Sequence, residues 1–85
     1  MFGRRRQRPV VRFYTRRGCG LCGRAADLVA REARRAEVRI IDVDSDPELE
    51  RRYGMRVPVV TIDDVEVAEL GLAAGQVRRA LRARR

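Results

Sequence analysis

The chain has 85 residues, which is enough for one domain with a single thin core. Hydrophobic residues make up 45% and charged residues 38% of it, a composition typical of a globular protein. No apolar run approaches the roughly 20 residues of a membrane-spanning helix, and no apolar segment follows the first basic residues as it would in a secretory signal. We therefore expect a cytoplasmic protein without a membrane span.

The formal net charge of +8 is unevenly distributed along the chain. Residues 9–77 contain eleven arginines and all twelve acidic residues, so the body carries a net charge of only −1. We predict a disordered basic arm over residues 1–8 and one folded domain over residues 9–85 that ends in a basic helix. A nearly neutral body with basic ends favours solvated tails, and no specific nucleic-acid partner is expected.

In chain order, residues 10–14 are β-branched or aromatic, which predicts a strand buried on both faces at the centre of a sheet. Two glycines interrupt this pattern before residue 21. A helical period begins at Leu21, with charged residues on one face. The opposite, apolar stripe consists of Cys22, Ala25, Ala26, Val29, Ala30 and Ala33.

A second strand is predicted over residues 38–42. Because a whole helix separates it from the first strand, the two strands should be parallel. Asp46 and Pro47 then indicate the N-cap and the first residue of a short helix over residues 47–53, which ends at Gly54.

Residues 57–62 and 65–69 predict two further strands joined by a tight turn at Asp63-Asp64. A last helix is expected after Gly71, although no local Ser, Thr or Asp caps its start. Its inner face would consist of Ala73, Val77, Ala80 and Leu81. The order β-α-β-α-β-β-α predicts an α/β fold of thioredoxin-like type, a four-stranded mixed sheet flanked by three helices.

Cys19 and Cys22 are the residues with the clearest chemistry. At the opening of a helix, side chains three residues apart are neighbours, so a disulfide can close between them. Cys19 lies at the helix N-terminus, which favours a thiolate, whereas Cys22 lies on the apolar stripe. Cys19 is therefore expected to be the nucleophile and Cys22 the resolving thiol. Positive charge that would lower the pKa of Cys19 further comes from Arg16, Arg17 and Arg24.

Several motifs occur in the order found in the glutaredoxin branch of the thioredoxin-fold superfamily: Tyr14-Thr15, Cys19-Gly-Leu-Cys22, Arg56-Val57-Pro58-Val59 and Gly71. Over about residues 10–81 the chain resembles the short glutaredoxin-like proteins of bacteria. The resemblance implies a disulfide oxidoreductase that reduces protein or mixed disulfides by a dithiol mechanism. It also implies that Pro58 is cis and faces the cysteines, and that the backbone of Val57 pairs with the substrate. The expected substrate contacts are Val57 and Pro58, together with three residues near Cys19: Arg16, Gly20 and Leu21.

The chain departs from the glutaredoxin pattern where that family holds glutathione. Leu21 replaces the aromatic residue beside the nucleophile, and no acidic residue follows Gly71. We expect no tightly bound cofactor. The reductant would be glutathione, another low-molecular-weight thiol or a thioredoxin reductase. The expected partner is a disulfide-containing protein substrate, and the chain itself is expected to be a monomer.

The C-x-x-C spacing also occurs in metal sites, but a mononuclear zinc site needs four ligands, and this chain has two Cys and no His. We therefore expect no metal site within one chain. Two alternatives stay open: a dimer that shares four cysteines around an iron–sulfur cluster, and a redox-sensing binding module with basic tails.

Overall fold

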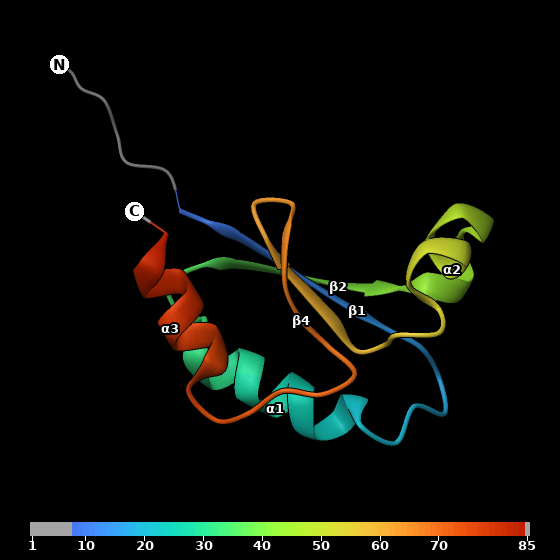
Figure 1. The fold of residues 1–85 in the computed structure, drawn as a ribbon, viewed down its shortest axis with the longest axis horizontal. Helices are drawn as coiled ribbons and strands as arrows, with labels where there is room; N and C mark the ends of the chain where they lie inside the picture. The colour runs from blue at the N-terminus through green and yellow to red at the C-terminus, as the bar shows by residue number, and fades with distance from the viewer. Residues whose placement is uncertain (1–7, 85) are drawn as a thin grey trace, which may run out of the picture.

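The computed structural model describes residues 8–84, which form a four-stranded mixed sheet in the order β2-β1-β3-β4 (Figure 1). β1 (Val10–Thr15) lies at its centre. It runs parallel to β2 (Glu37–Asp42) and antiparallel to β3 (Val59–Ile62), which pairs in turn with β4 (Val65–Glu69) in antiparallel orientation. The predicted thioredoxin-like fold and order of elements are confirmed. Of the predicted basic arm, all but Arg8 lies outside the described residues.

Three helices flank the sheet. α1 (Cys22–Glu32) and α3 (Gln76–Ala83) lie side by side, whereas α2 (Pro47–Tyr53) lies at the far end of the sheet (Figure 1). A single 3-10 turn, η1 (Val43–Ser45), joins β2 to α2. Among residues 8–84, none of the helices combines the length and apolar character needed to cross a membrane.

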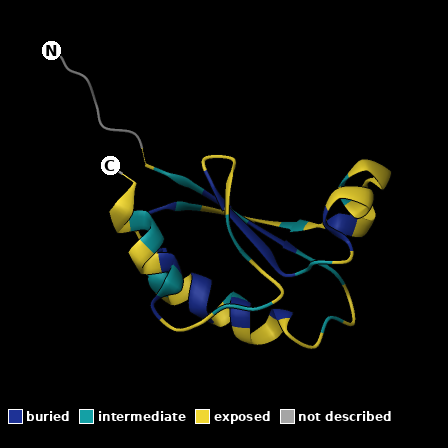
Figure 2. Cartoon of the chain, viewed as in Figure 1, coloured by how far each residue is buried: buried dark blue, intermediate teal, exposed yellow. Residues whose placement is uncertain are grey.

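The alternation of side chains along the central strands divides the core in two. On the side of α1 and α3, Val11 and Phe13 of β1 belong to a cluster that also contains Val60, Val29 and Val77. On the opposite side, the stacked rings of Tyr14 and Tyr53, with centroids 4.2 Å apart, pack with Val43 and Val59. The sheet centre is therefore covered on both faces, as predicted for the first strand, and the outer faces of the helices are exposed (Figure 2).

α1 differs in one respect from the predicted stripe. Leu28, which the predicted stripe left out, is buried, and Ala30, which it included, is exposed. A leucine removes more apolar surface from water than an alanine, so rotation of the buried face toward Leu28 is favourable. Ala30 instead lies above the edge strand β2, beside Val38 and Ile40.

Two strands differ from the prediction in extent or burial. β3 begins at Val59 rather than Val57, because Pro58 has no N–H to donate to a ladder. In β4, a strand with one buried and one solvent-facing side would bury its valines in alternation with Glu66, but Val65 is 64% exposed. A register shift opposite this strand, between Val60 and Thr61, disturbs the alternation between buried and exposed positions.

The start of α3 was predicted too early. The helix begins at Gln76, so Ala73 is exposed and lies outside it, while Val77 is buried and Ala80 and Leu81 are partly buried. The residue before the helix, Gly75, has a φ of 87°, a left-handed conformation that glycine adopts without steric cost.

The missing cap of α3 comes from another helix. The carboxylate of Glu32, the last residue of α1, accepts hydrogen bonds from the backbone N–H groups of Gly75 at 2.6 Å and Arg78 at 3.0 Å. Partial burial acts to raise the pKa of Glu32. The hydrogen bonds from Gly75, Arg78 and Val77, together with the charge of Arg78, outweigh this effect and lower the pKa below its ordinary value. One ionised side chain thus joins the two helices of this layer.

We predict that Glu32→Gln lowers the free energy of unfolding by roughly 0.5–1 kcal/mol at neutral pH, the size of a partly exposed cap interaction. Because the folded-state pKa of Glu32 is lowered, the stabilisation is complete above the pKa of the unfolded chain and is lost as pH falls through the folded-state pKa. Urea denaturation of both proteins across acidic pH should therefore show their difference shrinking. Asp27→Asn removes the same charge from an exposed position of α1 and is the control. A constant difference at all pH values would contradict the prediction.

Candidate functional site

Cys19 and Cys22 lie where β1 leads into α1. The loop is held by its own backbone, since the N–H of Cys19 donates to Arg16 O and the N–H of Cys22 donates to Cys19 O, each at 3.3 Å. The two Cα atoms are 5.4 Å apart, and the sulfurs are joined as a disulfide. Cys22 is 6% exposed and belongs to the larger core cluster, whereas Cys19 is partly exposed and packs at its margin. The pair is thus asymmetric in access, while the roles of its members stay predictions.

The N-terminus of α1 has no side-chain cap. Its N-cap residue is Leu21, and no acidic residue lies in its first turn. The unpaired N–H groups and the positive end of the helix dipole are therefore left without a compensating anion on the helix itself. In the reduced protein, this is an environment that favours a thiolate at Cys19.

Arg16 is engaged in an ion pair that the sequence did not indicate. Its guanidinium donates to Asp44 at 2.5 Å and to Gly54 O at 2.9 Å, and it lies 3.5 Å from Glu50. The hydrogen bond and charge of Arg16 lower the pKa of Asp44 below its ordinary value. Arg16 therefore ties the cysteine loop to η1 and α2, and two carboxylates compensate its charge.

The other two predicted arginines differ from Arg16. Arg17 and Arg24 are exposed and make no ion pair among the residues that the structure describes. Gly20 has open space where a side chain would begin, and Leu21 is 54% exposed. These residues lie at the surface beside Cys19, and their contacts with a substrate stay predictions.

The Val57–Pro58 peptide bond is cis, as the resemblance implied. Pro58 is buried, and Val57 is partly buried where it packs against both core clusters, one of which contains Cys22. Within residues 8–84, neither the N–H nor the C=O of Val57 has a backbone partner. The preceding Arg56 is anchored to Glu66 and Glu69 of β4 at 2.7 and 2.9 Å.

Leu70 belongs to the same region and was not singled out from the sequence. It has a φ of 63°, which is rare for a bulky residue, and is 52% exposed. Its N–H donates to Arg56 O at 3.0 Å and to Pro58 O at 2.9 Å, which holds it against the segment around Val57. No local signal predicts a left-handed leucine, so only the tertiary hydrogen bonds reveal it.

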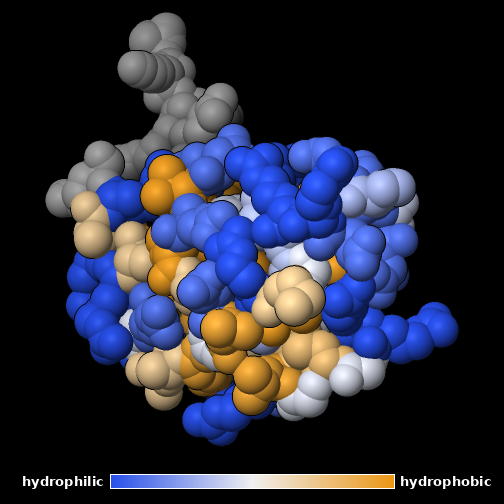
Figure 3. Space-filling model, turned by 45° about the vertical axis from the view of Figure 1, so that its right-hand side comes forward, coloured by the Kyte–Doolittle hydropathy of each residue, from blue (hydrophilic) through white to orange (hydrophobic). Residues whose placement is uncertain are grey.

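Apolar side chains gather across the lower part of the face in Figure 3. Figure 3 is turned about the vertical axis from Figure 1, so heights correspond, and the lower part of Figure 1 contains α1, the loop before it and the segment leading into α3. Charged side chains cover most of the upper part (Figure 3). An apolar surface at this level suits contact with another protein chain.

The acidic residues near the site have structural partners. Asp42 accepts the N–H of Asp44, and Asp46 accepts the N–H of Glu48 as the predicted cap of α2. Among residues 8–84, no three potential metal ligands of the Cys, His, Asp and Glu types come together. A tetrahedral metal site that used the two cysteine sulfurs would therefore need two further ligands from outside the described residues.

Comparison with known proteins gives the family. The Glutaredoxin-like domain (DUF836) model matches residues 10–82. The crystal structure of the target protein XcR50 from X. campestris is 31% identical, with a TM-score of 0.74, over 88% of this chain and 99% of that one. Protein Ne2328 from Nitrosomonas europaea is 25% identical, with a TM-score of 0.68, over 93% and 98%.

A more distant match supports the fold alone. Oxidised thioredoxin from Plasmodium falciparum is 17% identical, with a TM-score of 0.64, over 89% of this chain and 80% of that one. No curated protein matches the chain. The family match over residues 10–82, together with a cysteine pair at the start of α1, shows that the chain belongs to the glutaredoxin-like family of thioredoxin-fold proteins.

Proposed function

We propose that the protein is a thiol–disulfide oxidoreductase that reduces protein or mixed disulfides by a dithiol mechanism. The observation that carries this proposal is the Cys19–Cys22 pair at the uncapped start of α1, with one sulfur partly exposed and the other 6% exposed. The family and the fold support a redox role for such a pair.

The reaction consists of two exchanges. The Cys19 thiolate attacks one sulfur of the substrate disulfide, so the substrate S–S bond breaks, a mixed disulfide forms and the other substrate sulfur leaves as a thiolate that takes up a proton. Cys22, after losing its proton, attacks the sulfur of Cys19 and releases the second substrate thiolate. Two electrons have then passed to the substrate, and the Cys19–Cys22 disulfide has formed. A reductase or a thiol such as glutathione must return these electrons.

The different exposure of the two cysteine sulfurs determines which of them attacks the substrate first. A disulfide on a folded protein can reach Cys19 but not Cys22, which lies within the core cluster. Cys22 can reach only the sulfur atom of Cys19 itself, because the Cα atoms of the two residues are 5.4 Å apart and Cys22 is otherwise buried. Cys19 is therefore the nucleophile and Cys22 the resolving thiol.

The substrate chain would lie across the segment that precedes β3. The free N–H and C=O of Val57 suit pairing with an extended peptide, which is the role that the family resemblance implies. Exposed Leu21 and Leu70 supply apolar contacts. A left-handed leucine costs free energy in the folded state, and such strain is commonly retained where a side chain serves binding.

We predict that Cys19→Ser abolishes reduction of a protein disulfide, whereas Cys22→Ser lets the first exchange proceed and then stops. Mass spectrometry should find Cys22→Ser covalently joined to its substrate and Cys19→Ser free of it. Ala30→Ser, which adds a hydroxyl at an exposed position of α1, is the control and should keep full activity.

Failure of the wild-type protein to reduce a protein disulfide, with a thioredoxin reductase and with glutathione in turn, would overturn the proposal. A mixed disulfide formed by Cys19→Ser would reverse the assigned roles. Visible absorbance of the fresh protein that disappears in both variants would favour the iron–sulfur alternative.

The charges around Cys19 give a second prediction. Removing the exposed Arg17 with Arg17→Gln should raise the pH midpoint of Cys19 alkylation by roughly 0.3, since one screened charge acts there. The double variant Arg16→Gln with Asp44→Asn removes a neutral pair and should leave the midpoint almost unchanged. A larger increase in the double variant than in Arg17→Gln would show that Arg16 acts on Cys19 as an uncompensated charge.

The position of Leu70 gives a third prediction. Leu70→Gly keeps the left-handed backbone but removes the side chain, so KM for a protein disulfide with apolar neighbours should rise roughly two- to fivefold with kcat unchanged. Leu70→Asn, which also tolerates this conformation, should behave like Leu70→Gly. Val65→Thr, at an exposed position beside the distant hairpin turn, is the control. An unchanged KM in both Leu70 variants would exclude Leu70 from substrate binding.

A further inference from the structure

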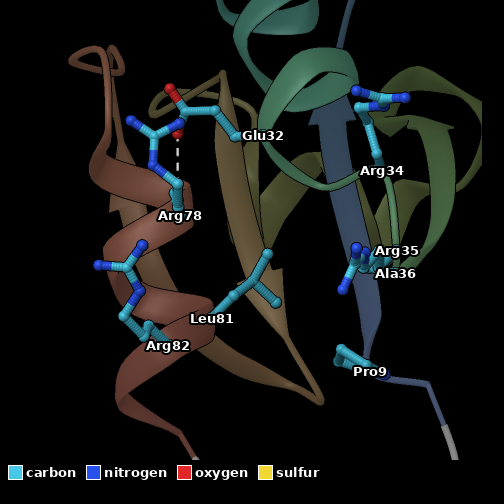
Figure 4. Close-up of a pocket in the computed structure, with 8 residues that line it drawn as sticks. All are labelled: Pro9, Glu32, Arg34, Arg35, Ala36, Arg78, Leu81 and Arg82. Atoms are coloured by element: carbon cyan, nitrogen blue, oxygen red, sulfur yellow. Dashed lines mark hydrogen bonds between the residues drawn. The ribbon is translucent and has the colours of Figure 1, made fainter.

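A second candidate site lies at the opposite end of α1 from the cysteines. A cavity of about 810 Å³ opens between α3, the end of α1 and the start of β1 (Figure 4). We propose that this cavity binds a phosphate-bearing anion of nucleotide size. Four arginines line it: Arg34, Arg35, Arg78 and Arg82.

The charge in this cavity is only partly compensated by a neighbouring carboxylate. Among residues 8–84, none of the four arginines makes an ion pair. The one acidic residue in the lining, Glu32, already accepts the N–H groups of Gly75 and Arg78. The negative end of the α1 dipole offsets only about half a charge. The lining therefore keeps an excess of more than two positive charges, which an anion would neutralise.

The arrangement suits phosphate in particular. Arg78 and Arg82 lie on α3 along one wall, and Arg34 and Arg35 lie on the other (Figure 4). Each guanidinium can donate two parallel hydrogen bonds to phosphate oxygens, which a single ammonium cannot do. Phosphate groups could therefore be bound from both sides.

The remaining lining is apolar and indicates a ligand with more than phosphate. Leu81 points into the space between the two walls, and Pro9 and Ala36 lie at the start of β1 and just before β2 (Figure 4). The volume lies within the range of about 300–1,000 Å³ that is typical of small-molecule pockets. A ligand with a flat apolar group and a charged phosphate chain, such as a nucleotide, matches both kinds of lining.

Exposed Arg8 directly precedes Pro9 and extends the positive surface. The same phosphates could belong to a free nucleotide or to a nucleic-acid strand. In either case the ligand would lie roughly 16 Å from the cysteines, because α1 has 11 residues with a rise of about 1.5 Å each. Binding should therefore be compatible with thiol–disulfide exchange.

Titration calorimetry of the full chain, with ATP, pyrophosphate, adenosine and a short single-stranded oligonucleotide as probes, tests the proposal. ATP should bind with a Kd that rises with salt, and adenosine should bind far more weakly. Arg35→Gln with Arg82→Gln should weaken ATP binding roughly tenfold or more. Arg31→Gln with Arg51→Gln removes the same charge from exposed positions and should weaken it less than about twofold.

Stronger binding of ATP than of pyrophosphate would support a nucleotide with a packed apolar group. Oligonucleotide binding that depends on Arg35 and Arg82, and that ATP does not displace, would identify nucleic acid as the source of the phosphates. Equal weakening in the two double variants, or no saturable binding of any phosphate-bearing probe, would overturn the proposal. Single Arg82→Gln, at an exposed position, provides the same comparison if circular dichroism shows the double variant to be misfolded.

Discussion

The packing of α1 against β1 is the interaction on which the cysteine site depends. The apolar stripe of α1 contains Ala25 and Val29, which pack with Val11 and Phe13 of the central strand. Cys22 lies on the same stripe, so the interaction that binds the helix to the sheet also buries this sulfur. Cys19 precedes the helix and stays at the surface. Cys22 is therefore buried because helical periodicity places it on the apolar stripe, and Cys19 stays accessible because it lies before the helix.

The opposite face of the sheet fixes the loop that carries Cys19. Arg16 extends from this loop to Asp44 in η1 and to Gly54 after α2. Gly54 permits the approach, since a side chain there would begin 2.5 Å from Glu50 O and 3.3 Å from the guanidinium of Arg16. The predicted role of Gly54 as a helix stop is confirmed, but its φ of −55° is not left-handed. Close approach, rather than backbone conformation, is the reason for a glycine.

The sequence predicted the elements whose signals are local and missed those that depend on distant residues. Asp46 and Pro47 begin α2 as predicted, and Asp63 and Asp64 both adopt positive φ in the hairpin turn. The start of α3 was wrong because its cap, Glu32, lies 43 residues before Gly75.

The same limit applies to the candidate site. The spacing of Cys19 and Cys22 was sufficient to predict that they could pair, since it brings the loop residue Cys19 within disulfide reach of the first residue of α1. The ion pair of Arg16 and the left-handed Leu70 could not be predicted, because their partners come from elements that only the fold brings together.

The fold also changes the meaning of the charge distribution. Along the sequence the body is nearly neutral and the ends are basic, but in space Arg34 and Arg35 of the body line the same cavity as Arg78 and Arg82 near the C-terminus. Positive charge is thus concentrated at one end of α1, and the redox pair lies at the other. The separation of roughly 16 Å exceeds the Debye length of about 8 Å at physiological ionic strength. An anion in the cavity would therefore leave the electrostatic environment of Cys19 largely unchanged, so phosphate binding and thiol chemistry can act independently on one small domain.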